Sequence, residues 1–93
     1  MTHTWKVAIH LFDGDDPRDD HDVTKAHAVL TTSSGTRLEG HGRARRAPYD
    51  PDVPEIGAEL AAARALREVA DRLLRATSDD ISELEHRDVQ IAR

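Results

Sequence analysis

Apolar and polar side chains alternate along three segments in the first half of the chain. These segments read TWKVAIHLF over residues 4–12, VTKAHAVLTT over 23–32 and TRLEGHGRAR over 36–45. An alternation with a period of two is typical of a β-strand that buries one of its faces. Gly14 and Pro17 interrupt the pattern after the first segment, and the sequence SSG before Thr36 is typical of a turn. The pattern therefore predicts three strands, at about 4–12, 23–32 and 36–45.

The second half of the chain changes to the spacing of an α-helix. Asp52 is placed to cap a helix, Glu55 follows three residues later as in a capping box, and Pro54 falls in the first turn. The apolar side of this helix is formed by Ile56, Leu60, Ala63, Leu66, Ala70, Leu73, Leu74 and Thr77. We predict a helix over about 53–77, followed by a short helix over about 79–85 that Ser78 caps.

The order strand, strand, strand, helix predicts an α+β fold in one domain over residues 1–93. Its simplest packing is a three-stranded antiparallel meander with one long C-terminal helix on one face. We expect the apolar side of the helix to cover Trp5, Val7, Ile9 and Leu11 on the first strand. Gly40 and Gly42 would let the helix lie close to the third strand, because a glycine inside a strand often marks a close approach.

Composition limits the core and the compartment. The chain has 93 residues, of which 3% are aromatic, so its single small core must consist mostly of Val, Ile, Leu and Ala. Small domains of this kind often gain stability by self-association, so the composition leaves a homo-oligomer open as an option. The absence of cysteine excludes disulfides and thiolate metal sites, and no apolar run is long enough for a membrane helix. We expect a soluble cytoplasmic protein that has no membrane partner.

The charge of the chain is concentrated in one segment. Between residues 13 and 22 lie six Asp and Arg18, which together carry the whole formal net charge of −5. The rest is neutral overall, yet the alternation gathers cations on the side of the sheet that faces away from the helix. The residues we expect to bind a nucleic acid or another partner there are Lys6, Lys25, Arg37, His41, Arg43, Arg45 and Arg46. An ordinary solvated surface and a self-association surface are the two alternatives.

Other chemistry finds little support in the sequence. The segment DGDDPRDDHD departs from a calcium loop, because position five is Pro17 and position twelve is Thr24. His10, His27 and His41 could come together across the three strands, but a basic surface disfavours a metal ion there. The sequence contains no nucleophile–base motif, phosphate loop or dinucleotide motif. We therefore expect no enzyme activity, no cofactor, no metal and no small-molecule substrate.

Three motifs resemble a family of small actinobacterial proteins of uncharacterised function. They are the W-x-V-x-I opening of the first strand, the G-x-G-x-A-R of the third strand and the helix motif VPEIGAELAAARAL from Val53 to Leu66. The resemblance covers about residues 4–82. It implies a β-β-β-α fold similar to double-stranded-RNA-binding domains and a dimer. It also implies a link to the hypoxia and dormancy response of mycobacterial relatives, which have been likened to ribosome hibernation-promoting factors.

Two functions follow as hypotheses. In the first, a non-enzymatic protein of the stress or dormancy response binds the ribosome or structured RNA through the basic surface. In the second, the chain is a homodimeric protein–protein adaptor or regulator that has no nucleic-acid partner.

Overall fold

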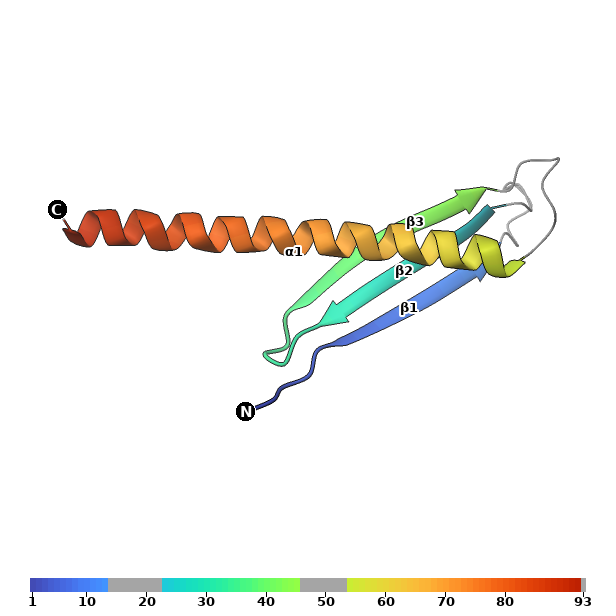
Figure 1. The fold of residues 1–93 in the computed structure, drawn as a ribbon, viewed down its shortest axis with the longest axis horizontal. Helices are drawn as coiled ribbons and strands as arrows, with labels where there is room; N and C mark the ends of the chain where they lie inside the picture. Colours follow the sequence, from blue (N-terminus) through green and yellow to red (C-terminus); the bar gives the residue numbers. More distant parts are fainter. Residues whose placement is uncertain (14–22, 46–53, 93) are drawn as a thin grey trace.

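The computed structural model describes residues 1–13, 23–45 and 54–92 (Figure 1). Arg46 and the expected helix cap Asp52 lie outside the described residues, as does most of the acidic segment. In the described part, three strands and one helix follow in the expected order.

The sheet is the predicted antiparallel meander. Its strands are β1 (Lys6–Asp13), β2 (Val23–Thr31) and β3 (Arg37–Arg45), and their order in the sheet is β1-β2-β3. Gly35 has a φ of 91° in the turn between β2 and β3, a conformation that favours glycine. The N–H of Thr32 donates to the carbonyl of Thr36 over 2.9 Å and closes this turn. The predicted fold class, including one long helix on one face of the sheet, is confirmed.

The helix differs from the prediction in its length. Helix α1 (Pro54–Ala92) has 39 residues and replaces the two helices expected at about 53–77 and 79–85. No glycine or proline follows Gly57, so no residue forces the backbone out of the helix. The hydroxyl of Thr77 donates to the carbonyl of Leu73 over 2.9 Å, a bond that lets threonine stay inside a helix. Ser78 is therefore an interior residue of α1 and caps no second helix.

A row of alanines forms the contact between α1 and the sheet. Ala61, Ala65 and Val69 of α1 are buried against β2 and β3, and Leu38 and Leu73 pack at the margin of this core. The buried strand residues in the same cluster are Ala26, Ala28, Leu30 and Ala44. The core is thus made mostly of small side chains, and it lies under the first half of the helix.

The two glycines of β3 explain how closely the helix approaches, as predicted. A Cβ atom built on Gly40 would lie 2.8 Å from Cγ2 of Val69, and one on Gly42 would lie 2.8 Å from Cβ of Arg64. Backbone atoms of Ala61 and Ala65 would be closer still. The helix backbone rests almost directly on the strand backbone, because neither glycine has a side chain to hold it away.

The helix turns a different side to the sheet from the one expected. The predicted contact residues Ile56, Leu60, Leu66 and Leu74 are 39–69% exposed. The close approach at Gly40 is the physical reason, because the gap there accepts a methyl group and excludes a leucine side chain. The alanine side therefore faces the sheet, and the larger aliphatic residues of α1 face away from it.

The expected burial of the first strand is also wrong. Val7 pairs with Leu30, Ile9 with Ala28 and Leu11 with Ala26, so the alternation places them on the helix side of the sheet as predicted. They are nevertheless 38–48% exposed, and Trp5 is 47% exposed. The helix crosses the strands obliquely, packs on β3 and β2 and has little contact with β1 (Figure 1).

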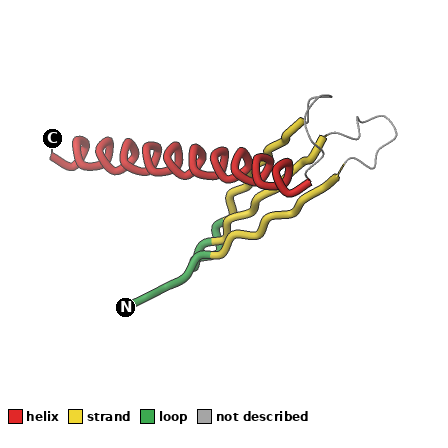
Figure 2. Tube along the Cα trace, turned by 45° about the vertical axis from the view of Figure 1, so that its right-hand side comes forward, coloured by secondary structure: helices red, strands yellow, loops and turns green. Residues whose placement is uncertain are grey.

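The second half of α1 extends beyond the sheet. At 1.5 Å per residue the helix is about 58 Å long, whereas a nine-residue strand spans about 30 Å. Within residues 55–85 of α1, Val69 is the last buried residue, and residues 77–85 are all exposed. Figure 2 shows the C-terminal half of the helix running on past the strands. Among the described residues, no helix is both long enough and apolar enough to cross a membrane.

Candidate nucleic-acid interface

The face of the sheet opposite α1 is here called the outer face. The alternation along each strand determines which side chains lie on it, and the strand register determines which of them are neighbours. One row across the sheet consists of Phe12, Lys25 and Arg43, and the next consists of His10, His27 and His41. Towards the other end follow the row of Ala8, Val29 and Glu39 and the row of Lys6, Thr31 and Arg37. The outer face therefore carries five cations, with Arg45 as the fifth, and Glu39 as its one anion among the described residues.

The structure places the predicted site residues in two groups. Lys25 and Arg43 are paired across β2 and β3, and Arg45 lies two residues further along the same face. Lys6 and Arg37 flank Thr31 at the opposite end of the strands, so they belong to a separate group. Arg46 lies outside the described residues. Among the predicted site residues that the structure describes, the larger group of cations is consequently at the end where β3 finishes.

The three histidines come together in one row across the sheet. The rings of His27 and His41 are stacked, with centroids 4.6 Å apart and planes at 3°, and those of His10 and His27 are 6.1 Å apart and tilted by 38°. Nε2 of His27 lies 3.3 Å from Oε1 of Glu39 without the alignment of a hydrogen bond. No group of three His, Cys, Asp or Glu side chains in the described ranges is arranged to hold a metal ion.

Polar side chains of α1 cover the edge of β3. The N–H of His41 donates to Oε1 of Glu68 over 3.3 Å, and Nη1 of Arg64 donates to the carbonyl of Arg43 over 2.7 Å. An edge strand exposes unpaired backbone groups that can recruit another strand, and such contacts prevent this. The guanidinium of Arg64 is thereby fixed at the margin of the outer face. Lys25, His41, Gly42, Arg43 and Arg64 line an open hollow there.

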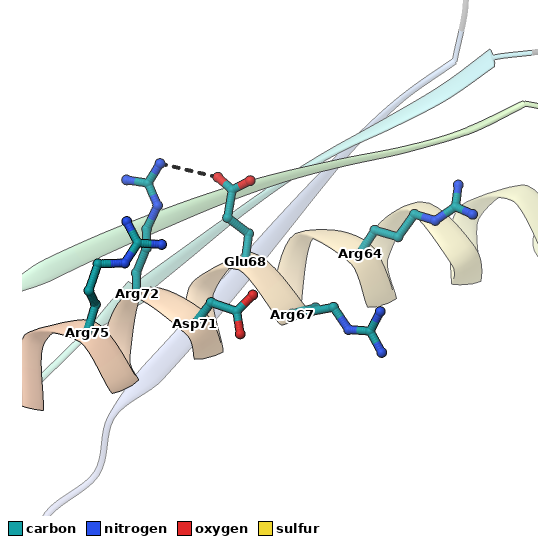
Figure 3. Close-up of a pocket in the computed structure, with 6 residues that line it drawn as sticks. All are labelled: Arg64, Arg67, Glu68, Asp71, Arg72 and Arg75. Atoms are coloured by element: carbon teal, nitrogen blue, oxygen red, sulfur yellow. Dashed lines mark hydrogen bonds and ion pairs between the residues drawn. The ribbon is translucent and has the colours of Figure 1, made fainter. Parts of the chain in front are cut away.

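A second group of arginines lies along one flank of α1. Arg64, Arg67, Arg72 and Arg75 line an open hollow there together with Glu68 and Asp71 (Figure 3). Nη2 of Arg72 lies 3.3 Å from Oε1 of Glu68, an exposed ion pair between residues four apart. Through Arg64, this helix surface adjoins the cations at the end of β3.

Two residues of this region were missed by the sequence analysis. Phe12 is 55% exposed and shares the row of Lys25 and Arg43, so the outer face has one aromatic side chain next to two cations. The alternation from Lys6 through His10 already implied its orientation. Arg64 could not have been found, because its position depends on the angle at which the helix crosses β3.

With this geometry established, comparison with known proteins places the chain in a family. Residues 3–90 match the model of the family described as Rv2632c-like. The chain belongs to the Rv2632c-like family. The resemblance seen in the strand and helix motifs is therefore confirmed at the level of the family.

Several proteins of mycobacteria are similar to this chain. The chain is 39% identical over 88 residues to the uncharacterized protein Mb1767 of Mycobacterium bovis, covering 94% of this chain and 85% of the relative. It is 43% identical over 72 residues to the uncharacterized protein Rv2632c of Mycobacterium tuberculosis, covering 76% of each. The crystal structure of Rv2632c superposes with a TM-score of 0.77 at 35% identity, covering 92% of this chain and 94% of that one. Members of the Rv2632c-like family thus share this fold, and their names assign no activity.

Proposed function

We propose that this protein is a non-enzymatic cytoplasmic binding protein that contacts structured RNA, such as that of the ribosome, through the outer face. The observation that carries the proposal is the concentration of Lys25, Arg43 and Arg45 at one end of an uncovered sheet face. Lysine and arginine bind phosphates without reading the base sequence. The family resemblance adds a double-stranded-RNA-binding type of fold and a role under stress or in dormancy.

The spacing of the cations supports recognition of a phosphate backbone rather than of bases. Cross-strand neighbours in a sheet lie about 5 Å apart and alternate residues of one strand about 7 Å apart, which are distances comparable to those between adjacent phosphates. Phe12 is the one phenylalanine, tyrosine or tryptophan among the described residues of the face. The rings of His27 and His41 stack on each other, so the face offers few free ring surfaces to successive bases. An RNA duplex recognised by its shape fits these side chains better than a single strand.

The direct test measures the binding of a short RNA duplex by fluorescence anisotropy at several salt concentrations. Arg43→Gln combined with Arg45→Gln is expected to weaken binding at least tenfold. Because each phosphate contact contributes about 0.9 to the slope of log K against log salt, the double variant should lower that slope by about 2.

A control variant separates the site from the net charge. Ser33→Asp combined with Ser34→Asp lowers the net charge by the same amount, and it changes the turn about 20 Å along β3 from Arg43. This control should bind like the unmodified protein. Equal losses in both variants, or absence of the unmodified protein from sedimented ribosomes at low salt, would contradict the proposal.

A second candidate function is that of a homodimeric protein–protein adaptor with no nucleic-acid partner. The exposure of large aliphatic side chains on α1 and β1 favours it, because such surfaces usually contact protein. This candidate predicts that neither RNA duplex nor ribosomes are bound at any salt concentration. It also predicts that the outer face binds an acidic protein, and that Arg43→Gln weakens that contact.

A further inference from the structure

Arg64 lines two hollows that lie on different sides of the edge strand β3. The first, here called the sheet hollow, opens on the outer face beside Lys25 and Arg43. The second, here called the helix hollow, opens on the flank of α1. The side chains of Arg64 and Glu68 bind the backbone of β3 between the two hollows. The edge of β3 with these two side chains, here called the β3 ridge, therefore has a hollow on either side.

Both hollows carry positive charge. Lys25, Arg43 and Arg64 line the sheet hollow, and no carboxylate is among its described lining residues. The helix hollow has four arginines against the two carboxylates of Glu68 and Asp71. An anion that approaches the β3 ridge from either side thus meets an excess of cations.

Two arginines of the helix hollow have no partner within the protein. Arg64 is bound to the carbonyl of Arg43, and Arg72 lies 3.3 Å from Glu68. Arg67 and Arg75, by contrast, are exposed and form no hydrogen bond or ion pair with any described residue (Figure 3). Their guanidinium groups are accessible to an anion from outside.

Stabilisation of the helix does not account for these two arginines. Opposite charges four residues apart can form ion pairs that stabilise an exposed helix. Asp71 follows Arg67 by four residues and precedes Arg75 by four, yet it pairs with neither of them. The arrangement leaves both guanidinium groups free when such a pair was within reach.

We propose that the β3 ridge lies in a groove of an RNA duplex, with phosphates of one strand in the sheet hollow and phosphates of the other strand in the helix hollow. This inference rests on the proposed function, and it adds the flank of α1 to the contact. Each groove of a duplex runs between the phosphate rows of its two strands, so a ridge with cations on both sides matches it. A single flat basic surface has no such match to two rows.

The minor groove is the one that fits. The major groove of an RNA duplex is deep and narrow, whereas its minor groove is wide and shallow and is contacted through phosphates and 2′-hydroxyls. A ridge made of a strand edge and the side chains of a helix is too broad for the narrow groove. Polar groups of Arg64 and Glu68 on the ridge would then face the 2′-hydroxyls.

The length of the helix hollow allows more than one phosphate contact. Eight residues separate Arg67 from Arg75, which is about 12 Å along the helix axis. Successive phosphates of one strand advance by only a few Å along a duplex, so the two arginines reach different phosphates. Each should therefore contribute separately to the salt dependence of binding.

The test measures the affinity of a short RNA duplex by fluorescence anisotropy at several salt concentrations. Arg67→Gln combined with Arg75→Gln should weaken binding at least fivefold and lower the slope of log K against log salt by about 2. Circular dichroism should show an unchanged helix, because neither side chain has an internal partner. A single-stranded RNA of the same length should bind more weakly than the duplex, since it has no groove.

Two further variants change the same hollow without removing its arginine charges. Arg67→Lys combined with Arg75→Lys keeps both cations and should bind within about twofold of the unmodified protein. Asp71→Asn removes an unpaired carboxylate from the hollow and should tighten binding about threefold. The control Ser33→Asp with Ser34→Asp lowers the net charge as much as the glutamine pair does, and it should leave the affinity unchanged.

The outcomes separate this inference from the proposed function. The inference is overturned if the glutamine pair at Arg67 and Arg75 binds like the unmodified protein, if the serine control loses as much affinity, or if single-stranded RNA binds as tightly as the duplex. The proposed function survives each of these results as long as Arg43→Gln with Arg45→Gln weakens binding. An unmodified protein that binds no RNA duplex at low salt would overturn both.

Discussion

Replacement of Gly42 by alanine is expected to lower the free energy of unfolding by about 3 kcal/mol, because one added methyl group has no space there. The new Cβ would meet the carbonyl of Ala61 and the backbone nitrogen of Ala65, which are fixed in the helix. Neither atom can rotate away as a side chain would. The helix as a whole must shift from β3, and the alanine contacts on either side are lost with it.

The free energy of unfolding is measured by chemical denaturation, with circular dichroism as the signal and the protein concentration held fixed. Gly35→Ala is the control, because a Cβ there has no neighbour within 4 Å although its φ of 91° is unfavourable for alanine. We expect this control to lose about 1 kcal/mol from the backbone conformation alone. If Gly42→Ala costs no more than Gly35→Ala, the helix does not lie as close to β3 as described.

Leu30→Ala is expected to have the second largest effect, a loss of about 2–4 kcal/mol. Leu30 is 5% exposed and is the largest side chain in a core made chiefly of alanine and valine. Its cross-strand neighbours are Val7 and Leu38, neither of which can move into the cavity without leaving its own strand position. The loss should be measured by the same denaturation experiment.

Phe12→Ala provides the contrast for this second variant. It removes a larger apolar side chain from β1, but Phe12 is exposed on the outer face, so the expected change is within about 0.5 kcal/mol. Similar losses for the two variants would mean that the core does not lie on the helix side of β2. The pair thus tests which face of the sheet is buried.

The sequence was sufficient to predict the strands, their order and the side to which each residue points. A period of two in the sequence determines which residues of a strand point to each face of the sheet. The observed register agrees with that assignment, from the Val7–Leu30 pair to the His27–His41 pair. The helix start was also predicted well, because proline and acidic residues mark it. These features depend on neighbours within a few residues, which is the range over which sequence patterns are informative.

The helix packing could not be predicted in the same way, because α1 has two apolar sides. The leucine side is the more hydrophobic, so the sequence pattern predicts it as the contact with the sheet. Gly40 and Gly42 determine which side of α1 packs on the sheet, because they create a gap that fits Ala61 and Ala65 and excludes leucine. The uncovered state of β1 and the position of Arg64 follow from the resulting crossing angle, which no local pattern encodes.

The contacts of Glu68 and Arg64 with β3 have a further consequence for assembly. They occupy one border of the sheet, and within the described ranges no strand is paired with the outer border of β1. A sheet of this kind can be extended on one side and is blocked on the other. If two molecules join strand to strand, the contact uses the open border of each, so strand pairing by itself adds no third molecule.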